Sequence, residues 1–189
     1  MLNMKDNKVK DLKEQLFSLI KNKAFFKEKI ILSSGKQSDY YIDVRLVTLT
    51  SEGAYLCASI ILDLVKYDDI QAIGGPTIGA DPLVGAIAAI GHLNKKPVKT
   101  FIVRKRPKEH GKRRQIEGPQ LTAGSKVILI DDVATTGDSL VDAVQALRQE
   151  KIEVIKAIVL VDRQEGATEN LAKVNCPLVS IFKSSDFLK

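Results

Sequence analysis

The segment with the clearest chemical potential runs from Val127 to Ser139. Its sequence is VILIDDVATTGDS: four aliphatic residues, two aspartates, a turn with two threonines and a glycine, and a residue that can begin a helix. Glycine lets the backbone approach a ligand, threonine hydroxyls donate hydrogen bonds, and unpaired N–H groups at a helix start attract phosphate. Asp131 and Asp132 suit ribose hydroxyls or Mg²⁺. The whole segment predicts a phosphate site, whereas an Asp-Asp pair alone would better fit an ordinary strand-turn-helix with acidic capping.

The positive charge of the chain is concentrated in residues 104–114. The 189-residue chain carries a net charge of +6, and this stretch holds seven basic residues against one acid, Glu109, a surplus equal to the whole net charge. Such a concentration indicates an anionic partner, either a phosphorylated small molecule or a nucleic acid. No aromatic residue that might stack on bases lies between Arg104 and Gly118, which favours the small molecule. A solvated loop or an RNA-contacting patch remains the alternative.

Several function classes are excluded by what the sequence lacks. No Walker motif occurs, and the spacing of Gly74, Gly75 and Gly79 does not match the dinucleotide-binding pattern. No apolar run approaches the roughly 18 residues of a membrane span, so no membrane association is expected. Cys57 and Cys176 show neither metal-ligand nor disulfide spacing, which favours a reduced, cytoplasmic protein.

The elements that must position these residues follow from the hydrophobic periodicity. Residues 5–21 predict an amphipathic helix, and two short β-like runs, 30–32 and 40–44, flank a turn. From residue 50 onward helices alternate with buried strands, which is typical of βαβ units and a parallel sheet. The expected strands are 71–74, 98–103, 127–130, 154–161 and 178–182, and the expected helices are 51–65, 82–90 and 139–148.

This pattern predicts an α/β fold with a mostly parallel central sheet flanked by helices. We expect a single domain over residues 1–189, with an N-terminal helix and small hood at 1–48 and an α/β core at 49–189. Within the core we expect a mobile loop at 105–118, because it is rich in charge and glycine. Ligands bind beyond the carboxyl ends of the strands in such sheets, so the loops there should carry the chemistry.

The segment from Val127 to Ser139 resembles the fingerprint with which type I phosphoribosyltransferases bind 5-phosphoribosyl 1-pyrophosphate (PRPP). The resemblance implies that Asp131 and Asp132 hold the ribose hydroxyls. It also implies that the following turn encloses the 5′-phosphate. The residues concerned are Val133, Ala134, Thr135, Thr136, Gly137, Asp138 and Ser139.

Three further segments resemble the orotate phosphoribosyltransferases within that family. Residues 32–43 are similar to a hood that lies over the base, and residues 104–111 to a mobile catalytic loop that reaches the neighbouring subunit's site. Residues 162–166 contain Arg163, where the family has an arginine that contacts orotate. The resemblance makes Lys105, Lys108, His110 and Asp132 the catalytic residues, adds Arg104 to the PRPP contacts of that loop, and assigns orotate to Thr135, Arg163 and Tyr41.

The same resemblance implies an activity, a cofactor and partners. PRPP and orotate would be the substrates, orotidine 5′-monophosphate and pyrophosphate the products, and the reaction a step of pyrimidine biosynthesis. Mg²⁺ is expected to be held through PRPP and water rather than by protein ligands. A homodimer is expected, with no nucleic acid partner. Two lysines found in many bacterial family members are missing, since positions 33 and 79 hold serine and glycine.

Alternatives remain open at this point. Another base, such as uracil or a purine, would share the fingerprint without needing Arg163 for a carboxylate. Arg163 could instead pair with Asp162 or Glu165 on the surface, and Tyr41 could simply be a strand residue. A transcriptional or RNA-binding regulator would keep the PRPP site as a sensor and use the basic loop on nucleic acid.

Overall fold

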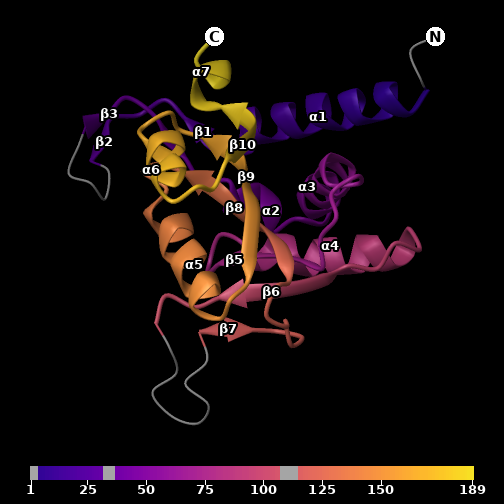
Figure 1. Cartoon of the computed structure of the whole chain (residues 1–189). Coiled ribbons are helices and arrows are strands. Elements are labelled where there is room, and N and C mark those ends of the chain that lie inside the picture. Colours follow the sequence, from indigo (N-terminus) through magenta and orange to yellow (C-terminus); the bar gives the residue numbers. More distant parts are fainter. Residues whose placement is uncertain (1–3, 32–36, 107–114) are drawn as a thin grey trace.

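The computed structural model describes residues 4–31, 37–106 and 115–189 (Figure 1). The helices are α1 (Met4–Lys23), α2 (Arg45–Thr48), α3 (Ser51–Leu64), α4 (Asp81–Leu93), α5 (Asp138–Gln149), α6 (Ala167–Lys173) and α7 (Ser184–Phe187). The strands are β1 (Phe25–Phe26), β2 (Ile30–Ile31), β3 (Gln37–Ser38), β4 (Tyr41–Ile42), β5 (Ala72–Pro76), β6 (Lys99–Val103), β7 (Ile116–Glu117), β8 (Lys126–Ala134), β9 (Glu153–Asp162) and β10 (Leu178–Lys183).

A six-stranded sheet with the order β10-β9-β8-β5-β6-β7 forms the centre of the molecule. Its strands are parallel except for β7, which pairs antiparallel with β6 at the edge. The predicted α/β fold with a mostly parallel sheet flanked by helices is therefore confirmed. None of the helices in the described ranges is long and apolar enough to cross a membrane.

Side chains alternate between the two faces of the sheet and build a core on each. Along β8, Ile128 and Ile130 pack with the buried residues of α1, α3 and α4, whereas Val127 and Leu129 pack with those of α5 and α6. This is the period-2 alternation of a strand. Both faces are apolar because helices cover both, as in other parallel sheets. Figure 1 shows the two helical layers, with α3 and α4 on one side and α5 on the other.

Two short antiparallel pairs form the hood before the core begins. β1 pairs with β4, and β2 pairs with β3. α1 anchors this region, since Leu12, Leu16 and Ile20 are buried in the core it shares with α3 and α4. Phe17 of α1 stacks on Phe187 of α7 with ring centroids 4.7 Å apart, so the C-terminal half of α1 packs against the C-terminal helix.

The predicted helices and core strands are present with small shifts at their ends. α3 begins after Thr50, whose side chain accepts a hydrogen bond from the N–H of Gly53, as expected for a capping residue. β8 is longer than predicted, because it continues through Asp131 and Asp132 to Ala134. The predicted strand ended at Ile130, before the two aspartates, and aspartate is disfavoured in strands.

The predicted loop over residues 105–118 differs in part from the structure. Residues 107–114 lie outside the described residues, but Ile116 and Glu117 form β7 and return the chain to the sheet edge. Gln115 and Arg104 close the base of the loop, since the Arg104 N–H donates to the Gln115 carbonyl at 2.8 Å and the Gln115 side chain donates to the Arg104 carbonyl at 2.9 Å. Helix α6, also absent from the sequence prediction, buries only Ala167 and Leu171.

Candidate active site

A cavity of about 490 Å³ lies at the carboxyl ends of the central strands. Its lining comes from the last residues of β8 and from the segments that follow β5, β6, β8 and β9, which is the expected place for a ligand in a parallel sheet. The hood contributes the remaining wall. The lining residues are Tyr41, Ile42, Asp43, Val44, Arg45, Thr77, Ile78, Gly79, Lys105, Asp131, Asp132, Val133, Thr135, Ser139 and Arg163.

The two aspartates of β8 present their carboxylates to this cavity from a buried strand. Asp131 Oδ1 accepts from the N–H of Asp132 at 2.9 Å, and Asp132 Oδ1 accepts from the N–H of Val133 at 2.7 Å. Gly79 approaches the same two oxygens so closely that a Cβ there would lie 2.3 Å from Asp131 Oδ1 and 2.4 Å from Asp132 Oδ1. Backbone contacts on one side and a glycine on the other therefore fix both carboxylates.

Burial raises the pKa of both aspartates. Asp131 is only 8% exposed, and its pKa lies well above the ordinary value because of this burial and the adjacent charge of Asp132. Burial also raises the pKa of Asp132, although the N–H of Val133 and the charge of Arg45 favour its ionised form. Two neighbouring carboxylates in a buried place favour ligands that donate hydrogen bonds or bring positive charge.

The turn between β8 and α5 has the form of an anion-binding loop. Gly137 adopts a positive φ of 78°, which glycine tolerates, and α5 begins immediately after it. Thr136 is fixed on both sides, since its hydroxyl donates to Asp138 Oδ2 at 2.8 Å and its carbonyl accepts from Asn170 Nδ2 at 2.9 Å. Thr135 and Ser139 line the cavity on either side of this turn. The free N–H groups of the first turn of α5 add to the attraction for a phosphate.

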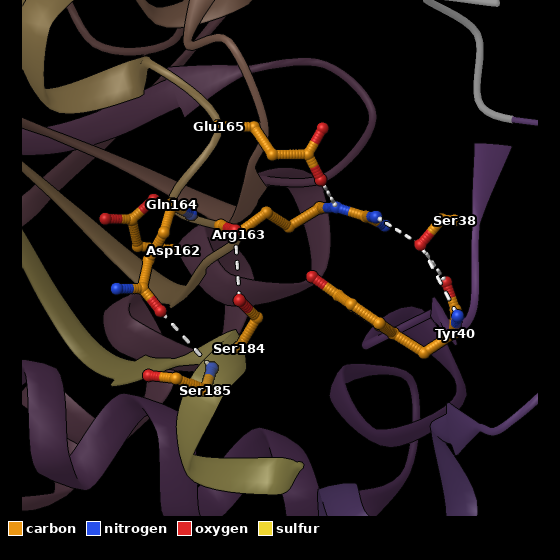
Figure 2. A network of polar contacts seen from close by, with 8 residues as sticks. All are labelled: Ser38, Tyr40, Asp162, Arg163, Gln164, Glu165, Ser184 and Ser185. Atoms are coloured by element: carbon orange, nitrogen blue, oxygen red, sulfur yellow. Dashed lines mark hydrogen bonds and ion pairs between the residues drawn. The ribbon is translucent and has the colours of Figure 1, made fainter. Parts of the chain in front are cut away.

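Arg163 enters the cavity from the end of β9, where it is almost wholly buried (Figure 2). Its Nε donates to Glu165 Oε1 at 2.8 Å and its Nη2 donates to Ser38 Oγ at 3.3 Å. The guanidinium carbon lies 4.9 Å from the centre of the Tyr40 ring. The pairing of Arg163 with Glu165 was one of the alternatives, but the pair lies at the cavity with a side-chain exposure of 4% for the arginine, not on the surface.

The C-terminal residues support this arginine from behind. Ser184 Oγ donates to the Arg163 carbonyl at 3.0 Å, and the N–H of Ser185 donates to Gln164 Oε1 at 3.3 Å (Figure 2). Tyr40 also stacks on Phe25 with ring centroids 5.7 Å apart, and Phe25 stacks on Phe187 of α7. The hood and α7 together hold the Arg163 side chain and its backbone.

The cavity brings together many of the residues that the sequence singled out, but not all. Tyr41, Lys105, Asp131, Asp132, Val133, Thr135, Ser139 and Arg163 line it. Four residues of the fingerprint do not line the cavity: Ala134, which ends β8, and Thr136, Gly137 and Asp138, which follow it. Arg104 lies at the base of the loop, where its Nη1 is 3.7 Å from Glu117 Oε1. Lys108 and His110 lie outside the described residues, as does Ser33.

Sequence reasoning missed Tyr40 as the partner of Arg163 and missed a charged pair, Asp43 and Arg45. The Arg45 guanidinium lowers the pKa of Asp43 through its hydrogen bonds and its charge. An acid and an arginine two positions apart, directly after a short strand, were the available signal for this pair. Thr77 and Ile78 also line the cavity, from the turn in which position 79 holds glycine instead of lysine.

Comparisons with known proteins agree with this arrangement. A family model described as "Phosphoribosyl transferase domain" matches residues 41–185. A protein of Aquifex aeolicus named orotate phosphoribosyltransferase is 47% identical over 157 residues, which cover 83% of this chain and 85% of that protein. A second of that name, from Rhodopseudomonas palustris, is 40% identical over 177 residues, covering 92% of this chain and 95% of the relative.

A solved structure gives the same result in three dimensions. Orotate phosphoribosyltransferase of Mycobacterium tuberculosis in complex with PRPP superposes with a TM-score of 0.78 at 30% identity, covering 94% of this chain and 99% of that one. The chain therefore belongs to the phosphoribosyltransferase family, and within it to the orotate phosphoribosyltransferases.

Proposed function

We propose that this protein transfers the phosphoribosyl group of PRPP to N1 of orotate, giving orotidine 5′-monophosphate and pyrophosphate in pyrimidine biosynthesis. The observation that carries the proposal is the buried Arg163 in the same cavity as the PRPP fingerprint. Orotate differs from uracil by a carboxylate, which needs a charged partner once it leaves water. Arg163 supplies that charge, and Thr135 and Tyr41 line the cavity as further orotate contacts.

On the PRPP side, we assign the ribose hydroxyls to the two aspartates of β8. Buried carboxylates that lack full compensation gain most from donors such as sugar hydroxyls. Asp132 also acts in catalysis, since it holds the ribose at the reacting carbon. The turn from Val133 to Ser139, including Ala134, Thr136, Gly137 and Asp138, encloses the 5′-phosphate beside the start of α5.

Negative charge grows on the departing pyrophosphate, so cations aimed at it lower the barrier. We assign this role to Lys105, which lines the cavity, and to Arg104, Lys108 and His110 of the same loop. A loop that closes over the site also excludes water, which would otherwise attack the sugar carbon.

We further propose that the reaction uses Mg²⁺. The donor set fits a cation bound mainly by substrate, because Mg²⁺ keeps several waters and takes substrate phosphates with few protein carboxylates. Within residues 4–31, 37–106 and 115–189, no group of three His, Cys, Asp or Glu residues could hold a metal on its own. When bound with PRPP, the ion would neutralise charge on the leaving pyrophosphate. Chelation should therefore abolish turnover.

We propose a homodimer in which the loop of one subunit completes the site of the other. Lys108→Ala and Asp132→Asn remove residues of the loop and of the strand, and each variant alone should be inactive. Mixed dimers of the two inactive variants should recover part of the activity, because one of the two sites then has both residues. Absence of recovery despite proven subunit exchange would show that each chain completes its own site.

We place the reaction in the cytoplasm. Cys57 and Cys176 are both buried free thiols, a state that a reducing compartment preserves.

The first experiment is a turnover assay with purified protein, PRPP and Mg²⁺, offering orotate, uracil, adenine and hypoxanthine separately. Consumption of orotate alone is the expected result. Turnover of another base would overturn the assignment of Arg163 while keeping the PRPP site. PRPP binding without any turnover would instead favour a regulatory protein.

A further inference from the structure

Arg45 lines the cavity, yet the reaction described above gives it no role. It begins α2, directly after the hood. It shares the cavity lining with Thr77, Ile78 and Gly79, the turn that follows β5. Its side chain is 43% exposed, so the charge is accessible to a ligand in the cavity.

Asp43 holds this arginine in a defined orientation. Arg45 Nε donates to Asp43 Oδ1 at 2.9 Å and Nη2 donates to Oδ2 at 3.2 Å, which is a two-point contact between guanidinium and carboxylate. The backbone N–H of Arg45 also donates to Asp43 Oδ1 at 3.2 Å, and the Tyr41 hydroxyl donates to Oδ2 at 3.4 Å. A side chain fixed in this way loses little entropy when it binds a second anion.

The guanidinium has donors left for that second anion. Asp43 occupies one edge of the planar group, and in the part of the chain that the structure describes no further hydrogen bond of the Arg45 side chain is seen. Arginine matches the oxygen spacing of phosphate groups and binds them at two points. The unused edge therefore suits a phosphate or diphosphate oxygen.

The turn after β5, which lines the cavity together with Arg45, has no cation of its own. Residues 76–81 read PTIGAD, without lysine or arginine. Position 79 has no room for a side chain as the structure stands, because a Cβ there would collide with the carboxylates of Asp131 and Asp132. A lysine at that position is thus incompatible with the observed placement of the two carboxylates. Positive charge for a ligand at this turn must come from elsewhere on the cavity wall.

Arg45 also acts electrostatically on the PRPP side of the cavity. Its charge favours the ionised form of Asp132, opposing the effect of burial on the pKa of that aspartate. In turn, Asp132 contributes to raising the pKa of Arg45, after the larger effect of Asp43. The guanidinium therefore lies close enough to Asp132 to influence its ionisation.

We propose that Arg45, oriented by Asp43, binds the diphosphate group of PRPP and supplies the positive charge that the turn at 77–79 lacks. The proposal rests on the proposed function and adds one residue to its machinery. It makes Asp43 a positioning residue, since Asp43 acts through Arg45 and repels the diphosphate itself.

The test compares Arg45→Gln, Arg45→Lys and Asp43→Asn with the wild-type enzyme in the presence of Mg²⁺. Two constants are measured: the KM for PRPP and the dissociation constant of inorganic pyrophosphate by calorimetry. Arg45→Gln should weaken both by about tenfold to 100-fold, the range for one lost hydrogen-bonded contact to a charged group. The KM for orotate should change less than twofold. Arg45→Lys should weaken both constants less than Arg45→Gln does, because lysine keeps the charge but loses the two-point contact.

Asp43→Asn should weaken pyrophosphate binding by a few-fold, and the double variant with Arg45→Gln should be no weaker than Arg45→Gln alone. This non-additivity separates a positioning role from an independent structural one. Lys96→Gln is the matched control, since it removes one exposed positive charge beyond the far end of α4. It should leave both constants unchanged.

Three outcomes would overturn the proposal. The first is unchanged pyrophosphate affinity in a folded Arg45→Gln variant, judged by its thermal transition. The second is an equal loss of affinity for ribose 5-phosphate, which would place Arg45 at the sugar phosphate instead. The third is an equal loss in Lys96→Gln, which would reduce the effect to net charge. Failure of the proposed function is distinct, because the wild-type protein would then not turn PRPP over with orotate, whether or not it binds PRPP or pyrophosphate.

Discussion

Two arginines in the cavity are each paired with a carboxylate two positions away, yet their surroundings differ. Arg163 pairs with Glu165 and has a side-chain exposure of 4%, whereas Arg45 pairs with Asp43 and has a side-chain exposure of 43%. Ser38 and Tyr40 cover Arg163, and the described residues place no such cover on Arg45. The same pairing of an arginine with a carboxylate two positions away thus occurs once with a buried arginine and once with a partly exposed one.

This difference teaches how one cavity can receive two unlike anions. A buried guanidinium suits a small planar anion that can shed its water and accept two hydrogen bonds from the arginine. An exposed guanidinium suits a highly charged group that keeps water and metal around it, as a diphosphate does. On the proposed assignments, burial and not residue type distinguishes the arginine that binds orotate from the arginine that binds the diphosphate.

The largest effect is expected for Arg163→Ala. The substitution leaves the orotate carboxylate without a charged partner in a buried place, and such a loss costs about 3–5 kcal/mol. We expect kcat/KM for orotate to fall by about 10³-fold while the dissociation constant of PRPP stays within a few-fold. Steady-state kinetics with each substrate varied separately gives both values. Equal losses for orotate and PRPP would erase the division between the two arginines.

Gly79→Ala should have the next largest effect, and it should affect PRPP instead of orotate. The new Cβ would lie 2.3 and 2.4 Å from the Asp131 and Asp132 carboxylates, so both must move away from the ribose position. We expect the KM for PRPP to rise by about tenfold or more, on the scale of one lost charged hydrogen bond. Orotate binding should be little changed.

Gly85→Ala is the matched control for this substitution. A Cβ at Gly85, within α4, meets nothing within 4 Å. Alanine in a helix interior is also favoured over glycine by up to about 1 kcal/mol. Gly85→Ala should therefore keep PRPP kinetics and raise thermal stability, and a similar rise in KM from both variants would contradict the role of Gly79.

Two aspartates of the cavity, Asp131 and Asp43, should affect the pH dependence of stability in opposite directions. The folded state raises the pKa of Asp131 above the ordinary 3.8, so this group binds a proton more readily folded than unfolded. Its contribution to stability is present below pH 3.8 and is lost as the pH rises toward the raised value. Asparagine at this position carries no charge to bury, so Asp131→Asn removes this loss of stability. We expect its Tm at pH 7–8 to exceed that of the wild type by a few degrees, whereas PRPP binding should be abolished.

Asp43 provides the contrast. The folded state lowers its pKa because Arg45 stabilises the carboxylate, so its contribution to stability is present above pH 3.8 and lost as the pH falls through the lowered value. Asp43→Asn should accordingly lower the Tm at neutral pH. Calorimetric scans of both variants from pH 4 to 8 measure this, and shifts of the same sign would contradict the assigned causes.

Much of the fold could be predicted from the sequence because its signals are local. Apolar runs give the strands, helical periodicity gives α1, α3, α4 and α5, and Thr50 marks the start of α3. The extent of β8 could not be predicted, since it carries Asp131 and Asp132 into a buried strand where ligand chemistry overrides propensity. β7 and α6 are too short to give a periodic signal.

The site was predictable where its residues are contiguous, as in the turn after β8. It was not predictable where tertiary contacts join distant segments. Ser38 and Arg163 are 125 positions apart, and nothing in either local sequence connects them. Arg45 was missed for the same reason, because only the folded cavity brings it together with the turn after β5.

The smallest effect is expected for Tyr40→Leu, which removes the ring beneath the Arg163 guanidinium. A cation lying over an aromatic ring gains about 0.5–1 kcal/mol at exposed sites and more when it is desolvated. Arg163 is buried and Tyr40 is partly exposed, so the KM for orotate should rise by at least about two- to fivefold. Tyr40→Phe keeps the ring and should match the wild type, which separates ring contact from the hydroxyl. If the ring serves only Arg163, neither variant will alter the KM for PRPP. A change in PRPP kinetics as large as that for orotate would mean that the hood covers both ends of the cavity, and that burial alone does not distinguish the two arginines.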